Sequence, residues 1–337
     1  MKIKITYLLI VVVSFYLVSC SGSSSKDDAA KKDSIVSPIE LITQQINKNP
    51  NIDSLYKQRA ELYLAIGKTE KALADVRMAL QINSEKTEYH ILLGDIYLAM
   101  GNIELSKKSL INAFDMDPRN PEPSLKLAEL NLFLQDYEKV YLYANKAIEI
   151  DNYNAPAYFI KGFAHLEQDD TAKAITAMQK ATQNDAEYYD AFIMLGKIFD
   201  NKKDPIAGNY LKTAVRIRPE SVEAHYNYGL WLQEHGLFDE AFSQYNALLT
   251  IDPHNKAAWY NIGYINLVYF ENYNKAIEYF TRAIESDPTY AEAYFNRGLS
   301  YEQLNQFDNA RSDYNKALSL KHNYENALKA LERIENK

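Results

Sequence analysis

A small residue recurs along this chain at intervals of 33 to 35 residues, and this regularity constrains the fold more than any other feature. The recurring residues are Ala60, Gly94, Ala128, Gly162, Gly196, Gly229, Gly263 and Gly298. Apolar residues around them recur at helical spacing, and a proline or turn residue closes most units. The interval shortens around residues 202–205 and lengthens near 270–272. Such a period predicts an array of similar helical units that stack on one another.

Two stretches show the unit clearly. They read WYNIGYINLVYFENYNKAIEYFTRAIESDP at residues 259–288 and HYNYGLWLQEHGLFDEAFSQYNALLTIDP at residues 225–253. Each has an aromatic residue or His, a Gly four residues later, a second helical pattern and a final Asp-Pro. The pattern resembles the tetratricopeptide repeat, a helix-turn-helix unit of about 34 residues. The resemblance implies an all-α solenoid, a right-handed superhelix, with eight repeats in residues 53–324.

The segments beside the repeats predict caps. Residues 38–52, which begin PIELITQQINK, resemble the second helix of a preceding repeat and predict an N-terminal capping half-repeat. Residues 325–337 have an amphipathic pattern with charges on one side, and we expect a C-terminal capping helix there. The end units of a repeat array need such caps because their outer faces meet water.

In this family the second, fifth, ninth and twelfth positions of a repeat face the concave side. At the N-terminal end of the array these positions hold charged, mostly acidic residues together with apolar ones. The charged residues are Lys57, Glu61, Glu88, Asp95, Glu122 and Glu129, and the apolar residues, which we expect to lie beneath them, are Leu64, Ile91, Leu98, Leu125 and Leu132. Further along they are aromatic or apolar. The resulting candidates for partner binding are Phe159, Phe163, Tyr226, Leu230, Tyr260, Tyr264, Phe295 and Leu299.

Two interpretations of these aromatic residues stay open. They form a peptide-binding strip, because aromatic side chains give large contact areas at low entropic cost. Alternatively they pack against the next repeat, as aromatic residues at the fifth position often do in this family. Tyr264 is the best candidate for binding, because the ninth position is less often aromatic. Asn227, Asn261 and Asn296 resemble a common structural residue of the family.

Other functions are disfavoured by the residues present. Repeats that clamp the Glu-Glu-Val-Asp tails of chaperones use Lys, Asn and Arg, but here Glu61 follows Lys57 and the third repeat lacks the basic pair. Residues 67–69, Gly-Lys-Thr, have Leu62 where a phosphate-binding loop needs glycine. The six histidines show no metal-ligand spacing. We therefore expect no enzyme activity, no metal and no cofactor.

The N-terminal residues point to a lipid anchor. A basic start, Met1–Lys4, precedes an apolar run from Ile5 to Val18, which is shorter than a membrane span. The run ends in Leu-Val-Ser-Cys, which resembles the lipobox of bacterial lipoproteins. The resemblance implies a signal peptide at residues 1–19, cleavage before Cys20, and acyl chains on that cysteine, the only one in the chain. Several acyl chains give stable anchoring.

Residues 20–37 are nearly free of apolar side chains after Cys20, and we interpret them as the lipidated cysteine and a flexible tether. Ser21 is not the aspartate that retains many lipoproteins at the inner membrane, so the resemblance implies the outer membrane. Lys26-Asp27-Asp28 resembles a surface-export signal, although a solvated tether explains the same charges. The array would then face the periplasm or the cell surface.

The charge of the chain limits its partners. The formal net charge is −8, which disfavours nucleic acid and anionic lipid as electrostatic partners. We therefore expect an outer-membrane adaptor that binds envelope proteins or peptides, with self-association left open. The alternative is a surface ligand-binding lipoprotein of a nutrient-uptake system, although such proteins carry large insertions between repeats.

Overall fold

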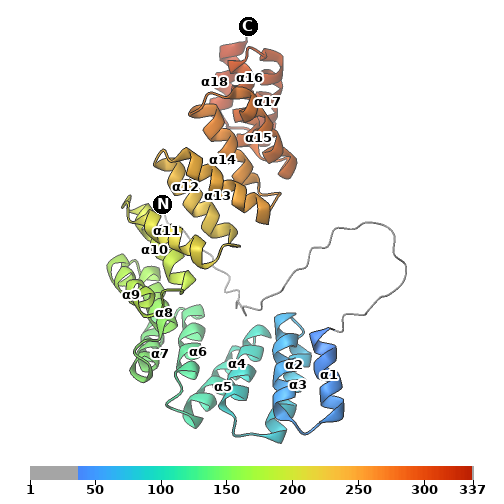
Figure 1. Ribbon diagram of the computed structural model, residues 1–337, viewed down its shortest axis with the longest axis vertical. Coiled ribbons are helices and arrows are strands. Elements are labelled where there is room, and N and C mark those ends of the chain that lie inside the picture. Colours follow the sequence, from blue (N-terminus) through green and yellow to red (C-terminus); the bar gives the residue numbers. More distant parts are fainter. Residues whose placement is uncertain (1–36, 336–337) are drawn as a thin grey trace, which may run out of the picture. The chain divides into compact units, whose positions relative to one another are not determined.

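The computed structural model describes residues 37–335, and every regular element in that range is a helix (Figure 1). The all-α fold expected from the sequence is confirmed. The helices are α1 (Pro38–Lys48), α2 (Asp53–Ala65), α3 (Thr69–Ile82), α4 (Thr87–Ala99), α5 (Ile103–Met116), α6 (Pro121–Phe133), α7 (Tyr137–Ile150), α8 (Ala155–Glu167), α9 (Thr171–Asn184), α10 (Tyr189–Asn201), α11 (Ala207–Ile217), α12 (Val222–Glu234), α13 (Phe238–Ile251), α14 (Lys256–Val268), α15 (Tyr273–Ser286), α16 (Ala291–Gln303), α17 (Phe307–Leu320) and α18 (Glu325–Ile334).

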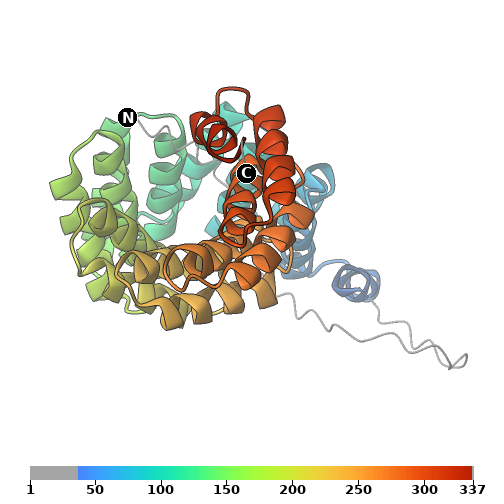
Figure 2. The ribbon, with the colours of Figure 1, turned by 90° about the horizontal axis from the view of Figure 1, so that it is seen from above.

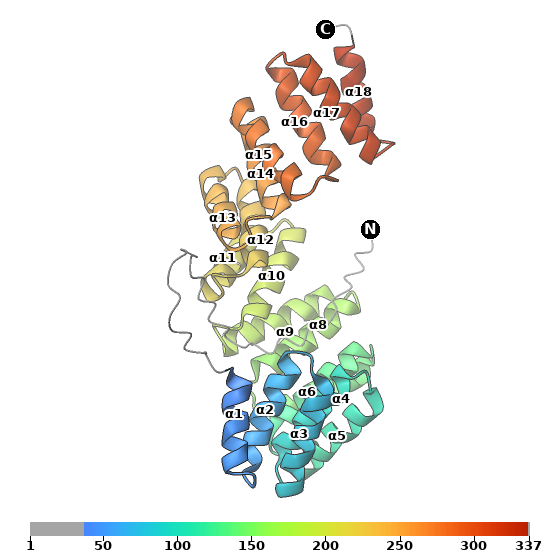
Figure 3. The same cartoon turned by 90° about the vertical axis from the view of Figure 1, so that its right-hand side faces the viewer.

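The chain divides into two compact units, unit 1 up to Asn184 and unit 2 from Asp185. In each unit a first helix packs on the helix that follows it, as α2 does on α3 and α14 does on α15. Figures 2 and 3 show these hairpins in chain order from two further directions. The first helices of neighbouring hairpins also touch, α2 with α4 and α6 with α8 in unit 1, and α10 with α12 and α14 with α16 in unit 2. They therefore share one side of each unit, which we call the first-helix face.

Each hairpin closes where a small residue of the first helix meets one side chain of the second. A Cβ atom added to Gly263 would lie 2.9 Å from Cδ1 of Phe280, closer than packed carbon atoms can approach. Where the small residue is alanine, the facing side chain is smaller, and Ala128 clusters with Ala144. The pairing keeps the summed volume roughly constant, as a close-packed interior requires.

The turn inside each hairpin holds one residue with positive φ. These residues are Gly67, Gly101, Gln135, Asp169, Lys203, Gly236, Glu271 and Asn305. The turn between α14 and α15 is one residue longer than the turns of the hairpins on either side of it. There the Asn272 amide donates to the Asn266 carbonyl, six residues back, whereas the Gln306 amide of the next hairpin donates to Tyr301, five residues back. The insertion predicted near residues 270–272 therefore lies in this turn.

A three-residue clamp joins α1 to the first hairpin. The Arg59 guanidinium donates two hydrogen bonds to the carboxylate of Asp75, both at 2.7 Å, and a third to Oγ1 of Thr43 in α1 at 3.0 Å. A Ser37 capping box starts α1, because Ser37 Oγ accepts from the Glu40 amide and the Glu40 carboxylate accepts from the Ser37 amide.

The same clamp recurs in the last hairpin. Arg297 donates two bonds to Asp313 at 2.8 Å and one to Oγ1 of Thr281 at 3.0 Å. Thr281 lies on α15, the second helix of the preceding hairpin. Thr43 of α1 occupies the corresponding place in the first clamp, so α1 packs on the first hairpin as a second helix would. This position agrees with the proposal that residues 38–52 form a capping half-repeat.

At the other end of the chain α18 covers the last hairpin (Figure 3). Ala327, Ala330 and Ile334 of α18 are buried in one cluster with Tyr314 of α17. Arg333 donates two hydrogen bonds to the carboxylate of Glu302, both at 2.7 Å. Within residues 37–335 no helix has both the length and the apolar character of a membrane span.

Candidate functional site

Tyr260 of α14 lies at the centre of the aromatic side chains on the first-helix face of unit 2. Its ring centroid is 6.3 Å from that of Tyr264 and 5.1 Å from that of Tyr290. Its hydroxyl accepts a hydrogen bond from Nδ2 of Asn296, on the neighbouring first helix α16, at 2.7 Å. Burial, with the nearby hydroxyls of Tyr324 and Tyr264, raises the pKa of Tyr260 to about 12. The Tyr260 hydroxyl is therefore neutral at physiological pH. The hydrogen bond from Asn296 and the neighbouring rings hold the side chain in position.

The other predicted residues of unit 2 lie on the first helices α12, α14 and α16, and their side chains are exposed to different degrees. Phe295 is buried, with its ring 5.7 Å from Tyr314 and 5.0 Å from Tyr324. Phe295 therefore packs inside unit 2 and does not offer its ring to a partner. Leu299 packs against the same cluster and keeps part of its surface exposed.

Three predicted residues remain accessible on α12 and α14. Tyr226 is half-buried against the cluster that contains Tyr245, and Leu230 is half-buried one turn further along α12. Tyr264 is half-buried between the rings of Tyr260 and Tyr269, with centroids 6.3 Å from each. Because neighbouring residues already hold these rings in place, the rings lose little conformational entropy when a partner binds to their exposed surface.

The asparagines expected to be structural make hydrogen bonds inside unit 2. Asn261 is buried and donates from Nδ2 to the hydroxyl of Tyr245 at 3.2 Å, and that hydroxyl donates to Oε1 of Gln233 at 3.0 Å. Asn227 donates to the carbonyl of Glu223 on its own helix at 2.8 Å. Asn296 holds Tyr260, so one asparagine also positions a candidate binding residue.

Ion pairs cover the first-helix face of unit 1. Lys57 of α2 lies 3.2 Å from Glu61 on the same helix and 3.1 Å from Glu88 on α4. A lysine that is already shared by two carboxylates is poorly placed to clamp the carboxylate of a peptide.

A second lysine on this face, Lys126 of α6, was missing from the predicted set. Its Nζ lies 3.4 Å from Asp95 on α4 and 3.5 Å from Glu129 on α6. Burial raises the pKa of Asp95 and of Glu129, against the attraction of Lys126. Lys126 occupies the sixth position of its repeat, which the list of concave positions omits. The face is therefore less acidic than the sequence positions alone indicated.

The remaining candidates of unit 1 lie on α8. Phe159 and Phe163 are both half-buried, with ring centroids 6.2 Å apart and planes tilted by 45°. Cys20, the predicted lipid attachment site, lies outside the described residues.

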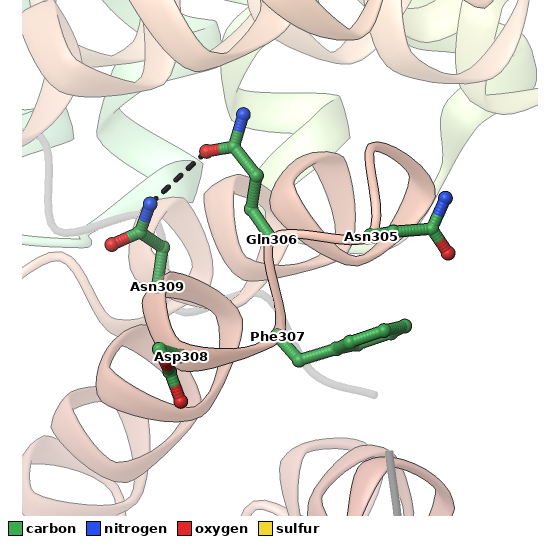
Figure 4. A pocket seen from close by; sticks show the side chains of 5 residues that line it. All are labelled: Asn305, Gln306, Phe307, Asp308 and Asn309. Atoms are coloured by element: carbon green, nitrogen blue, oxygen red, sulfur yellow. Dashed lines mark hydrogen bonds between the residues drawn. The ribbon is translucent and has the colours of Figure 1, made fainter.

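No group of three His, Cys, Asp or Glu side chains within residues 37–335 could hold a metal ion. Gly67 and Lys68 lie in the turn between α2 and α3, Thr69 begins α3, and Leu62 lies inside α2. A shallow hollow at residues 305–309 is lined by one hairpin turn (Figure 4). Its side chains diverge except for Asn309, which donates to Gln306 at 3.0 Å.

Comparisons with known families match several of the hairpins. Models described as the tetratricopeptide repeat match residues 87–120, 155–188, 205–256 and 291–324, and a model described as the TPR repeat matches residues 269–305. All of these models describe repeats, and none indicates an enzymatic domain. Hairpins α2–α3 and α6–α7 lie outside the matched residues, so the number of eight repeats stays a prediction.

Curated relatives resemble the chain over most of its length. The mouse DnaJ homolog subfamily C member 7 is 23% identical over 81% of this chain and 61% of its own length. The human mitochondrial import receptor subunit TOM70 is 22% identical over 78% of this chain and 40% of its own length. The chain thus spans about three fifths or less of these relatives.

Solved structures show the same fold. The C-terminal part of a TPR repeat-containing protein from Cytophaga hutchinsonii covers 73% of this chain and 99% of that chain, with a TM-score of 0.59 and 16% identity. The Pseudomonas aeruginosa protein pilF covers 61% of this chain and 94% of that chain, with a TM-score of 0.51 and 17% identity. The helical hairpins, the family models and these structures agree, and the chain is therefore a tetratricopeptide repeat protein.

Proposed function

We propose that this chain is a non-enzymatic scaffold that binds protein partners through the first-helix face of its repeats. In this proposal lipid on Cys20 anchors it to the outer membrane, and its partners are proteins or peptides of the cell envelope. The observation that carries the binding role is the set of aromatic side chains on α12 and α14, namely Tyr226, Tyr260 and Tyr264. These side chains are partly exposed and held in place by neighbours.

The physical support comes from Tyr260 and Tyr264. Tyr260 is fixed by the hydrogen bond from Asn296 and by the ring of Tyr290. It in turn supports Tyr264, which keeps part of its ring exposed. Rigid aromatic anchors of this kind dominate many protein interfaces, because little conformational freedom is lost when a partner binds.

The anchoring role rests on the sequence alone. Leu17-Val18-Ser19-Cys20 carries the lipobox resemblance, and the charged tether would give the repeats reach from the membrane. Cys20→Ser should prevent lipidation and leave the protein soluble or as uncleaved precursor. Fractionation of this variant with the outer membrane at the mass of the cleaved protein, as for the unchanged protein, would contradict the anchor.

The binding role is tested by affinity purification of the full chain from cross-linked cell envelopes. Tyr264→Ser removes an accessible ring and leaves the Asn296 hydrogen bond of Tyr260 in place. Leu142→Ser is a matched control, because Leu142 is exposed on α7, a second helix of unit 1. We expect partners to be lost with Tyr264→Ser and kept with Leu142→Ser. Equal recovery of every partner with both variants would contradict binding at this face.

Changing Tyr260 to alanine is a poor test of binding. Tyr260 packs against a buried cluster that includes Ala283 and Ala293, and it satisfies the amide of Asn296. Its removal would weaken the fold of unit 2, and a lost partner could then reflect unfolding alone.

A further inference from the structure

An exposed aromatic patch lies at the turn between α14 and α15, beside the first-helix face of unit 2. We call it the turn-edge patch; its residues are Leu237, Phe238, Phe242, Val268, Tyr269 and Phe270. Tyr269 and Phe270 are each 47% exposed, and Val268 is 45% exposed. Three consecutive large apolar residues at this exposure are unusual on a soluble protein, and such patches commonly mark interaction sites.

The rings of the patch hold one another in place. The Phe238 ring lies 4.3 Å from that of Tyr269 and 5.7 Å from that of Phe270, centroid to centroid. Phe242 lies 5.8 Å from Phe270. The patch is therefore an ordered surface that joins the α14–α15 turn to α13, rather than a set of separately mobile side chains.

The patch is also continuous with the aromatic residues of the first-helix face. Tyr269 lies 6.3 Å from Tyr264, and Tyr264 lies 6.3 Å from Tyr260. Tyr269 is the C-cap residue of α14, and Phe270 follows it in the turn. A partner that contacts Tyr264 thus has a second apolar surface within reach, outside the positions that face the concave side.

Acidic side chains around the patch indicate the chemistry of its occupant. Asp239 follows Phe238 in the first turn of α13, and Glu271 follows Phe270. Both are exposed, and within the described residues neither forms an ion pair. Cationic groups on a partner would complement them. A second copy docking through the same patch would oppose like charges, and an anionic membrane would be repelled.

We propose that the turn-edge patch docks a segment of a partner protein in which apolar or aromatic side chains are flanked by lysine or arginine. This inference rests on the proposed scaffold function and adds a second contact surface and a partner chemistry to it. Apolar contact with Tyr269 and Phe270 supplies affinity, and the acidic residues select the flanking charge.

The test is cross-linking in cells that produce the full chain with the photoreactive amino acid p-benzoylphenylalanine in place of Tyr269. Tyr153 is a matched control position, because it is a tyrosine with 71% exposure in the turn between α7 and α8. Mass spectrometry maps the cross-linked segment. A second set of cells adds Asp239→Asn and Glu271→Gln, which remove the charges and keep the side-chain shapes.

We expect position 269 to capture a protein segment that contains apolar residues flanked by lysine or arginine. The yield should fall by about threefold or more without the two charges, while position 153 captures no such segment. Cross-links to lipid, to a second copy, or to a segment without basic residues would overturn the proposal. So would a yield that matches position 153 or is unaffected by the charge changes. If Tyr264→Ser still abolishes partner capture in that case, the scaffold function stands and only the turn-edge site fails.

Discussion

Neighbouring first helices are joined by ion pairs in unit 1 and mainly by aromatic and amide groups in the last hairpins of unit 2. Lys57 joins α2 to α4, and Lys126 joins α6 to α4. In unit 2 Asn296 of α16 holds Tyr260 of α14, although α10 and α12 are still joined by an ion pair between Lys197 and Glu223. The same backbone repeat therefore presents two chemically different faces. One is sensitive to salt and pH, and the other is governed by packing and neutral hydrogen bonds.

Both units contain the same internal clamp, in which an arginine of a first helix bonds to an aspartate and a threonine of the second helices on either side. The first prediction compares the two clamps. Arg59→Met and Arg297→Met should each lower the free energy of unfolding by about 3 kcal/mol, because each leaves a buried aspartate without its partner. Urea unfolding of the full chain, followed by circular dichroism, measures the loss.

Arg282→Met provides the control for both clamp variants. Arg282 pairs with Glu285 at 3.5 Å, and both side chains are more than half exposed. Its removal should change stability by about 0.5 kcal/mol or less. A similarly small effect of Arg297→Met would mean that the clamp does not hold the end of unit 2.

The second prediction concerns the packing of unit 2. Gly263→Leu should cost about 2 to 3 kcal/mol, because a side chain at this position collides with Phe280. Gly263→Ala should cost less, and adding Phe280→Leu to it should recover part of that loss. Thermal unfolding of the unchanged protein, Gly263→Ala, Phe280→Leu and the double variant measures the coupling between the two sites. Strict additivity of the two changes would contradict the pairing of small with large residues.

The third prediction separates the supporting tyrosine from the accessible one. Tyr260→Phe should lower stability by about 1 to 2 kcal/mol, since the buried amide of Asn296 loses its acceptor. Tyr264→Phe should leave stability unchanged and keep partner binding. Chemical unfolding of both variants provides the comparison. Equal losses would show that the two rings do not have separate roles.

The smallest expected effect lies on the ion-paired face of unit 1. Burial raises the pKa of Asp95, so its ionised form is less stable in the folded chain than in the unfolded chain. The stability that the protonated form contributes is present below about pH 4 and is lost as the pH rises. Asp95→Asn should therefore raise stability at pH 7 by about 1 kcal/mol or less, and the gain should vanish below about pH 4. Unfolding curves across this range measure the difference.

Glu122→Gln is the matched control, because Glu122 is exposed on the same face. It should leave the stability unchanged at both pH values. A lower stability of Asp95→Asn at pH 7 would mean that the Lys126 ion pair outweighs the burial of the carboxylate.

The interval of small residues was enough to predict the all-α fold. Each interval corresponds to a helix pair, and its cause is local: Gly or Ala at one position permits one close contact per hairpin. The list of concave positions named Tyr260 and Tyr264, which lie on a first helix, and their role in binding stays a prediction. These features follow from residues whose neighbours are fixed by the repeat itself.

Other features depend on contacts between repeats, which the repeat pattern does not specify. Lys126 occupies the sixth position, and its role follows from the location of Asp95 on the preceding first helix. The burial of Phe295 depends on Tyr324, which lies beyond the last repeated helix. Tyr269 is the C-cap residue of α14, and its exposure depends on how the turn packs against Phe238 of the preceding hairpin.

Hydroxyl-radical footprinting of the full chain, with and without a partner recovered from the envelope, tests the central claim most directly. Oxidation of an aromatic side chain reports its exposure, so Tyr264 and Tyr153 can be compared in one sample. We predict that the partner reduces oxidation of Tyr264 and leaves Tyr153 unchanged. Unchanged oxidation of Tyr264, with protection confined to second helices such as α7 or α13, would contradict binding through the first-helix face.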